Sequence, residues 1–351
     1  MYYHQGILQL NIEIITTPNE DLKESGFGTT KSCNSILETV LLLGHNATLN
    51  ICSTREDLYK TIQRQPDLVI LAVKYLSFEG ENDIWLSDYF SKNNINHTGS
   101  SRASLKYDSD KVLAKQHLKS IGIKTADFFT AIPGQYKSEE ELPLLFPLFL
   151  KPTDAANGNG IDDLSLVRNF TEFESKVLSL HRSFALPVLV EEYLDGKEYT
   201  VSVIQKPSGE IIASPIEIVP MLSTNGLRIL GEKAKKDDCE ELNKIGNNSI
   251  KASLKQLAID AFIGLGVRDF GRIDIKTNSA GEYFFMEANL VPGMTHGSSY
   301  FPKAFEIENS STYDEVIELM LSAGISRIHS LMEINNIIFS DENLLTNTIN
   351  R

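Results

Sequence analysis

The first hundred residues constrain the fold most strongly, because short apolar runs alternate there with amphipathic segments. The runs NIEII, ATLNI, DLVILAV and INHTG have the composition of strands, and SILETVLLLG, EDLYKTIQRQ and WLSDYFSKNN have the spacing of helices. This alternation predicts a parallel sheet with helices on its faces. No GxGxxG motif follows the first strand, so we expect a Rossmann-like domain over residues 1–100 by pattern only.

Two α+β units are predicted beyond this domain. In residues 101–187, SDKVLAKQHLKSIG predicts a helix entered through Ser109 and stopped at Gly122, followed by the strands TADFFTAI, LFPLFLKP and DDLSLV and the helix TEFESKVLSLH. In residues 188–330, a hairpin built on KEYTVSVIQ and IIASPIEIV precedes a long helix and a second hairpin, DFGRIDIKTNSAGEYFFMEANL. Residues 331–351 are Asn-rich and predict a loosely docked tail.

Charge and cysteine content limit the classes of partner. The 351 residues include 33 Lys+Arg and 47 Asp+Glu, giving a net charge of -14, which disfavours general affinity for nucleic acid or anionic membranes. Three cysteines without metal-like spacing, and no stretch as apolar as a signal peptide or a membrane span, favour a cytoplasmic protein. We therefore expect small-molecule partners, and a homodimer is left open.

The second hairpin carries the clearest chemical signal. A turn centred on Ser279–Ala280, with two or four loop residues, makes Arg272 face Glu287 and Asp274 face Phe285. The side-chain period of two then puts the polar residues on one face. The opposite, apolar face is predicted to hold Ile273, Ile275, Phe284, Met286 and Ala288.

The polar face of this hairpin offers hard oxygen ligands beside an arginine. Asp274, Glu287 and Asn289 suit Mg²⁺, which takes one or two carboxylates and completes its shell with water and phosphate oxygens. The adjacent Arg272 suits a phosphate or an oxyanion. The alternative is a solvated face with cross-strand ion pairs. The loop NLVPGMTHGSS that follows is long and rich in hydroxyl groups, which favours a substrate-binding role.

Elements for a nucleotide lie upstream of this hairpin. Lys111 is near the start of a predicted helix, where the macrodipole also favours an anion, and Lys151 closes an apolar strand. The loop TDAANGNG after Lys151 could fold over phosphates. In VLVEEYLDGKEYTV, backbone groups and a glutamate could contact adenine, and Glu198 could reach the ribose. Taken singly, each lysine or glutamate is more often only solvated.

In this order, SDK, FLKP, VLVEEYLDGKEYTV, GRIDI and MEANLVPGMT resemble the ATP-grasp fold and, within it, the D-alanine–D-alanine ligase family. The resemblance covers most of the chain from His97 to Lys303. It implies an enzyme that uses ATP and Mg²⁺, with Mn²⁺ as an alternative, activates a carboxylate as an acyl phosphate and joins it to an amine, releasing ADP and phosphate.

The resemblance also implies roles for individual residues. Phosphates are contacted by Lys111 and Lys151 and by Lys233 or Lys235, adenine is held by Glu191, Glu192, Tyr193 and Leu194, and the ribose is bound by Glu198. The metal is ligated by Asp274, Glu287 and Asn289, and Arg272 stabilises the transition state. The carboxylate of the second substrate is bound by Ser298 or Ser299.

Departures from the family pattern fall on the first-substrate half. The family's GGxSxEHxVS-like segment reads SGFGTTKSCNS here, which puts Thr30 near the place of an ammonium-binding glutamate. VKYLSFEGEND replaces HGxxGEDG, and TDAANGNG has lost the serines of the central loop. We therefore expect a carboxylate–amine ligase for substrates other than two D-alanines. A genuine D-alanine–D-alanine ligase and an ATP-binding protein without turnover are the alternatives.

Overall fold

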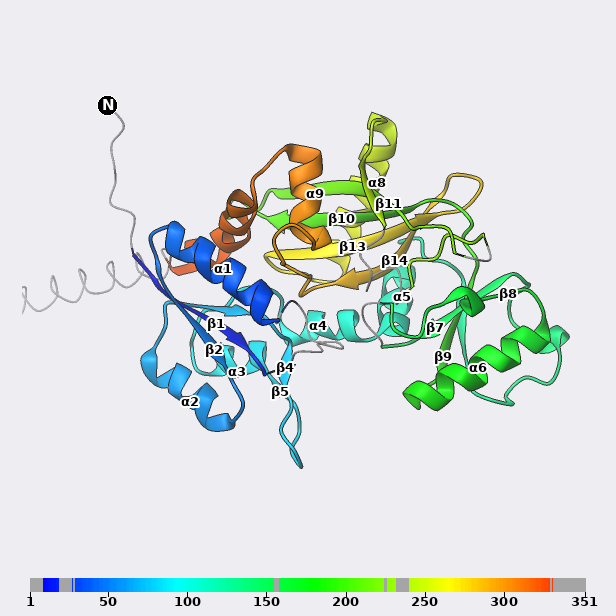
Figure 1. Ribbon diagram of the computed structural model, residues 1–351, viewed down its shortest axis with the longest axis horizontal. Helices are drawn as coiled ribbons and strands as arrows, with labels where there is room; N and C mark the ends of the chain where they lie inside the picture. The colour runs from blue at the N-terminus through cyan, green and yellow to red at the C-terminus, as the bar shows by residue number, and fades with distance from the viewer. Residues whose placement is uncertain are drawn as a thin grey trace, which may run out of the picture.

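The computed structural model describes residues 9–18, 27, 29–154, 158–223, 226–231, 240–328 and 330. Three larger sheets organise these residues. In Figure 1 the first sheet lies at the left end of the elongated molecule, the second at the right end, and the third between them toward the top. The order of elements is α/β in the first domain and mixed α+β beyond it.

The first sheet has the order β2-β1-β3 and is parallel, as predicted. Its strands are β1 (Asn11–Thr16), β2 (Asn46–Ile51) and β3 (Leu68–Leu71), and its helices are α1 (Thr30–Leu42), α2 (Arg55–Arg64) and α3 (Leu86–Lys92). Helix α1 begins five residues before the predicted segment, because Thr29 caps it by accepting a hydrogen bond from the Ser32 amide at 3.2 Å. A short hairpin, β4 (Tyr75–Leu76) and β5 (Ile84–Trp85), was not predicted.

The second sheet has the order β6-β9-β7-β8 and is antiparallel. It contains β6 (Phe128–Ala131), β7 (Leu148–Pro152), β8 (Leu166–Val167) and β9 (Val188–Glu192), packs against α6 (Phe170–Phe184), and includes the single turns η1 (Glu139–Glu141) and η2 (Asp163–Ser165). The predicted third unit, residues 188–330, began with strand β9, but β9 is a central strand of the second sheet.

Two helices lead into the second sheet, α4 (Arg102–Ser109) and α5 (Lys111–Ser120). The predicted entry through Ser109 is wrong. Ser109 ends α4, and Asp110 caps α5 by accepting from the Leu113 amide at 2.9 Å. The Lys111 amide donates to Thr153 O at 3.1 Å, which ties the start of α5 to the end of β7.

The third sheet is antiparallel and has the order β12-β11-β10-β13-β14. Its strands are β10 (Glu198–Gln205), β11 (Ile211–Val219), β12 (Glu241–Lys244), β13 (Phe270–Thr277) and β14 (Tyr283–Asn289). Helices α8 (Asn248–Gly264) and α9 (Tyr300–Asn309) pack against it, and residues 313–328 form a further helix. The two predicted hairpins are therefore neighbours in one sheet.

The predicted register of the second hairpin is wrong by two residues. Arg272 pairs with Asn289 and Asp274 pairs with Glu287, because the connection is five residues long and a bulge follows Asp274. A shift of two keeps the four polar side chains on one face. The bulge changes the apolar face, where Phe285 is buried in place of the predicted Phe284 and Met286.

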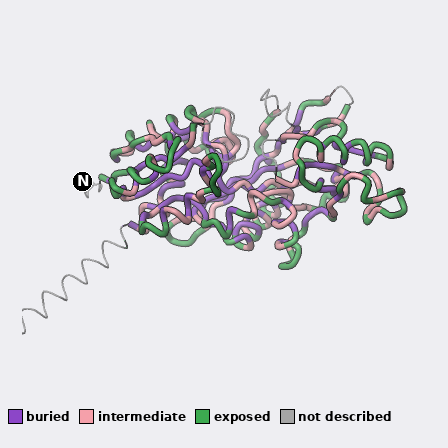
Figure 2. The backbone as a smooth tube through the Cα atoms, turned by 90° about the horizontal axis from the view of Figure 1, so that it is seen from below, coloured by how far each residue is buried: buried purple, intermediate pink, exposed green. Residues whose placement is uncertain are grey.

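One continuous apolar core runs from the first sheet to the third, and a separate cluster lies between the second sheet and α6. Figure 2 shows buried segments in the interior at both ends of the molecule. No helix in the described ranges is long and apolar enough to cross a membrane.

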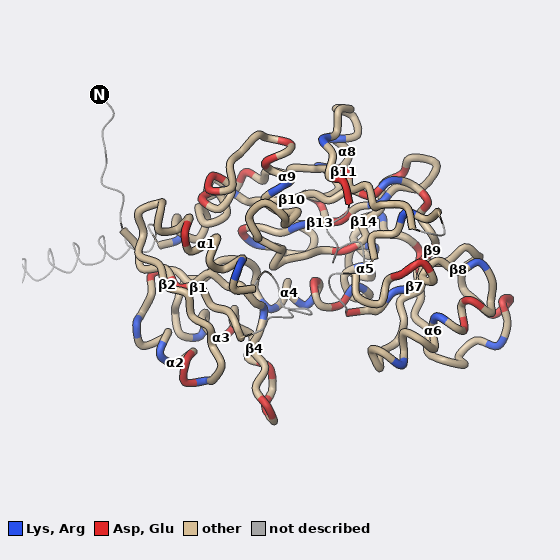
Figure 3. Tube along the Cα trace, viewed as in Figure 1, with Lys and Arg blue, Asp and Glu red and all other residues tan. Residues whose placement is uncertain are grey.

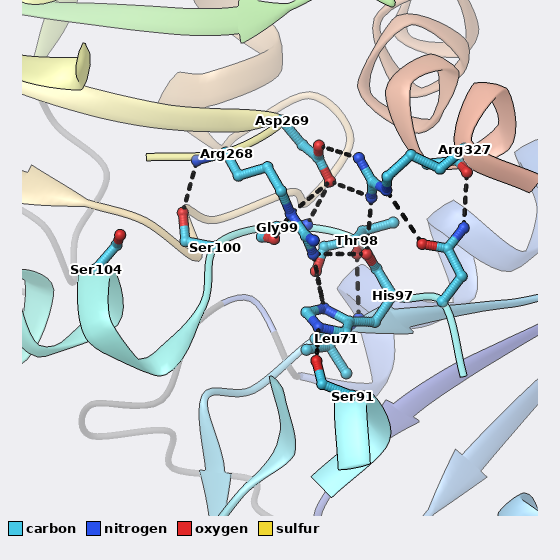
Figure 4. A network of polar contacts seen from close by, with 12 residues as sticks. Leu71, Ser91, His97, Thr98, Gly99, Ser100, Ser104, Arg268, Asp269 and Arg327 are labelled. Carbon is cyan, nitrogen blue, oxygen red and sulfur yellow. Dashed lines mark hydrogen bonds and ion pairs between the residues drawn. The ribbon is translucent and has the colours of Figure 1, made fainter. Parts of the chain in front are cut away.

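A buried polar network joins the first domain to the third sheet (Figure 4). Asp269, which has a left-handed φ of 68°, accepts from the Gly99 amide at 2.9 Å and from Arg327 at 2.6 and 2.9 Å. Arg268 donates to His97 O at 2.9 Å and lies 3.1 Å from the His97 ring nitrogen. Burial and the neighbouring Arg268 lower the pKa of His97 to about 4. This network fixes where β13 begins.

Candidate active site

Asp274 is the centre of the polar face on the second hairpin. It accepts two hydrogen bonds from Arg272, both at 3.0 Å, one from Thr200 at 2.6 Å and one from Asn289 at 3.2 Å. The Arg272 side chain is buried, which opposes its charge, but Asp274 outweighs burial and raises the pKa of Arg272. The alternative of a solvated face is excluded for this part of the hairpin.

Glu287 lies directly across from Asp274, and its carboxylate is 3.6 Å from the Lys111 ammonium. In the described part of the chain, no three His, Cys, Asp or Glu side chains come together as a metal site. The available donor set is two facing carboxylates and the Asn289 amide. Such a set is too small for a closed protein cage but fits Mg²⁺, which shares its shell with phosphate and water.

Tyr300, at the start of α9, covers Arg272 from the other side. The guanidinium lies 5.3 Å from the centre of the tyrosine ring, and the tyrosine hydroxyl donates to Glu240. Burial and this glutamate raise the pKa of Tyr300, so it remains a neutral phenol. Tyr300 was not identified from the sequence, because no element was predicted for the segment that forms α9.

Glu191 forms a buried charge cluster with two lysines. Its carboxylate is 2.7 Å from Lys151 and 2.5 Å from Lys115, and all three side chains are at most 5% exposed. Burial alone would raise the pKa of Glu191, but the two ammonium groups lower it below its ordinary value. Although Glu191 borders the cleft, each oxygen of its carboxylate is paired with a lysine, which does not fit the expectation that this carboxylate contacts adenine. Its backbone can still border the nucleotide.

A cleft lies between the second and third sheets. It brings together nine of the residues named from the sequence: Lys111, Lys151, Glu191, Glu192, Tyr193, Leu194, Glu198, Asp274 and Glu287. Arg272 and Asn289 lie behind Asp274 and reach the cleft through it. Figure 3 shows basic and acidic segments side by side where α5, β7 and β9 meet.

Apolar side chains from both sheets line the rest of the cleft. Phe149 comes from β7, Ile218 from β11 and Met286 from β14, so a flat ring could be held between two apolar walls. Glu198 pairs with Lys276 at 2.5 Å. The apolar lining was not identified from the sequence, because these residues look like ordinary strand positions until the two sheets are brought face to face.

The loop after β14 is closed by its own hydrogen bonds. Ser299 accepts from the Thr295 amide at 2.8 Å and occupies the N-cap position of α9 without a side-chain capping bond. The Ser298 amide donates to Thr295 O at 3.3 Å. Neither serine lines the cleft. Ser32, in the first turn of α1, hydrogen-bonds to Thr295, which brings the start of α1 against this loop. Thr30 is the first residue of that helix.

A second contact fixes where the same loop begins. Asp108 accepts from the Leu290 amide at 2.6 Å and pairs with the buried Lys74 at 2.9 Å. Lys74 lies in the segment that replaces the family's HGxxGEDG motif. The two expected phosphate lysines, Lys233 and Lys235, lie outside the described residues.

Comparisons with known proteins agree with this arrangement. The family model described as "D-ala D-ala ligase C-terminus" matches residues 117–338. A D-alanine–D-alanine ligase from Marinomonas sp. is 30% identical over 203 residues, which are 58% of this chain and 61% of that protein's length. The D-alanine–D-alanine ligase from Aquifex aeolicus is 26% identical over 293 residues, covering 83% of this chain and 94% of the relative.

Solved structures show the same fold. The crystal structure of D-alanine–D-alanine ligase from Bacillus anthracis complexed with ATP has a TM-score of 0.67 at 19% identity, and the match covers 92% of this chain and 99% of that one. The ATP-grasp fold expected from the sequence is thereby confirmed.

Proposed function

This chain belongs to the D-alanine–D-alanine ligase family, and on that premise we propose that it is an ATP-dependent, ADP-forming carboxylate–amine ligase. The observation that carries the proposal is the cleft in which basic side chains from α5 and β7 face the carboxylates of the second hairpin. Such a cleft suits a triphosphate and a divalent cation together.

In this proposal the nucleotide lies with its base between the apolar walls and its phosphates toward the hairpin. The backbone of 191–194 borders adenine, Glu198 binds the ribose, and Lys111 and Lys151 contact phosphates. Either Lys233 or Lys235 adds a third phosphate contact. The support is that the described members of this set line one cleft.

Asp274, Glu287 and Asn289 would hold Mg²⁺, and Mn²⁺ could replace it. When bound, the metal neutralises phosphate charge during transfer of the γ-phosphoryl group. Arg272 would add a fixed positive charge on the same side. The guanidinium of Arg272 is oriented by hydrogen bonds to Asp274 at one edge and by the Tyr300 ring against its face.

The proposed reaction has two steps. An oxygen of the substrate carboxylate attacks the γ-phosphorus of ATP, the bond to the β-phosphate oxygen breaks, and ADP leaves. The nitrogen of the amine then attacks the carbonyl carbon of the acyl phosphate, phosphate leaves, and the nitrogen gives up a proton. The cleft contributes mainly by positioning the reactants and stabilising charge.

The substrates are proposed to be small carboxylic acids and amines, most simply amino acids. Thr30 begins α1, and Ser32 in its first turn hydrogen-bonds to Thr295 in the loop that follows β14. A hydroxyl group lacks the negative charge with which the family's glutamate offsets an ammonium ion, which favours a first substrate other than D-alanine. D-Alanine with D-alanine is kept as the second candidate because the curated relatives above carry that name.

The test is release of ADP and phosphate from ATP with single and paired amino acids of both chiralities. Each pair is run with Mg²⁺, with a chelator, and with Glu287→Gln as the matched blank. Phosphate release with one pair, absent from both blanks, supports ligase activity. Release with D-alanine alone selects the second candidate. Tight ATP binding without release from any pair would instead identify an ATP-binding protein without turnover.

A further inference from the structure

Lys115 is a charged side chain buried behind the cleft. Its ammonium is 2.5 Å from Glu191 Oε1 and donates to Thr125 Oγ1 at 2.9 Å and to Phe285 O at 3.3 Å. Three acceptors match the three N–H groups of an ammonium. The side chain is fully buried and does not line the cleft, so it cannot contact a ligand there.

The acceptors of Lys115 come from three different places in the fold. Glu191 is in β9 of the second sheet, Phe285 is in β14 of the third sheet, and Thr125 lies in the segment between α5 and β6. The Phe285 amide donates to Lys124 O at 2.9 Å, so the backbone also joins the two sheets at this point. Lys115 therefore lies where the two walls of the cleft meet.

Resting on the function proposed above, we propose that Lys115 is a positioning residue for ATP, which acts by neutralising Glu191 and so leaves the positive charge of Lys151 directed at the phosphates. Glu191 holds one lysine on each carboxylate oxygen, Lys115 on the buried side and Lys151 on the cleft side. The three groups together carry one net positive charge. Without Lys115, Glu191 and Lys151 would cancel, and the cleft would lose that charge.

A purely structural role for Lys115 makes a different prediction. If Lys115 only filled space and satisfied Glu191, removing it would lower the stability of the fold. Any loss of ATP affinity would then not be reversed by a second substitution at Glu191. If it acts through charge, removing the Glu191 charge as well should restore the net charge of the cluster. The two roles therefore differ in the double variant Lys115→Met/Glu191→Gln.

The experiment measures ATP affinity by titration calorimetry in the presence of Mg²⁺, on the full chain, without amine or carboxylate substrates. For Lys115→Met we expect binding roughly 10- to 100-fold weaker, from the loss of one buried charge near the phosphates. For the double variant we expect affinity within about threefold of the parent. Lys119→Met is the matched control, because Lys119 is on the same helix but is 58% exposed and pairs with Asp127.

Each outcome decides the proposal. Unchanged affinity in Lys115→Met, or a double variant as weak as that single variant, overturns it. If Lys115→Met does not fold, Glu191→Gln is compared with the double variant. Burial lowers the pKa of Lys115 to about 8 even beside Glu191, so without that carboxylate the lysine is largely neutral and its removal should change ATP affinity little. A further large loss in that background shows that Lys115 acts without Glu191 and overturns the proposal. A parent protein that does not bind ATP refutes the proposed function itself, whatever the variants do.

Discussion

The substitution Glu287→Gln should separate metal binding from stability at the second hairpin. The Glu287 side chain is 25% exposed and lies 3.6 Å from Lys111, so the ion pair is partly solvated. Such a pair contributes about 1 kcal/mol or less, and the amide keeps the shape of the carboxylate. We therefore expect the free energy of unfolding to change by no more than about 1 kcal/mol.

The effect on the reaction should be much larger. Glu287 is one of only two carboxylates in the proposed donor set, and neutralising it removes half of the protein charge that holds the cation. Loss of several kcal/mol of metal-based stabilisation corresponds to turnover on the order of 100-fold lower or more. Lower Mg²⁺ affinity should also shift the midpoint of a Mg²⁺ titration upward.

Asp274→Asn is the contrasting variant. Asp274 accepts both hydrogen bonds of the buried Arg272 and one from Asn289, and an asparagine can accept only part of these while leaving Arg272 without a counter-charge. Breaking a buried pair in this way costs about 3 kcal/mol or more. Asp274→Asn should thus lose both stability and turnover, while Glu287→Gln should lose turnover alone.

Urea unfolding and ADP release over a Mg²⁺ series measure the two effects separately. Half or more of the Mg²⁺-dependent turnover remaining in Glu287→Gln would refute the metal assignment. Equal destabilisation of the two variants would refute the argument from exposure and pairing.

Three further predictions address other parts of the molecule. Tyr300→Phe should keep most turnover because the ring over Arg272 remains, whereas Tyr300→Leu should lower kcat about tenfold with little change in the KM for ATP. The pKa of His97 is about 4 in the folded protein and 6.5 in the unfolded chain, so the unfolded chain binds a proton first as the pH falls. The free energy of unfolding should therefore fall by about 2 kcal/mol between about pH 7 and about pH 5. Chemical denaturation of His97→Gln over the same pH range should show most of that loss removed. A Cβ at Gly196 would lie 2.5 Å from Thr277 O, so thermal unfolding of Gly196→Ala should show destabilisation of about 2 kcal/mol; an unchanged midpoint would contradict the close approach.

The polar face of the hairpin could be predicted because it depends only on side-chain alternation. A shift of register by two residues leaves Asp274 and Glu287 on the same face, so the wrong turn did not affect the proposed metal ligands. The bulge after Asp274 could not be read from the sequence, since it exchanges Met286 for Phe285 on the apolar face without any change in composition.

Packing between distant segments was beyond sequence reasoning. Lys111, Lys115 and Lys119 recur every four residues on one helix, and nothing in that spacing distinguishes their roles. Only the fold places the first beside Glu287, buries the second against Glu191 and leaves the third exposed. The same holds for Tyr300, whose contact with Arg272 requires α9 to fold back over β13.

The ion pairs around the cleft can be replaced by ionic contacts with a nucleotide and a metal ion. Within the described residues, four of the five carboxylates named for the site have a cationic partner, in the pairs Lys111–Glu287, Lys151–Glu191, Arg272–Asp274 and Lys276–Glu198, and the fifth, Glu192, accepts from the Asp127 amide. A triphosphate that attracts Lys111 and Arg272 would remove the cationic partners of Glu287 and Asp274, and a cation bound to those carboxylates would release the same basic groups. Each ligand therefore offsets the free-energy cost of the unpaired charges that the other ligand would leave. Nucleotide and metal should thus each increase the affinity for the other. Lys115 is a further cation beside these four pairs, and it gives the cluster of Glu191, Lys115 and Lys151 its net positive charge.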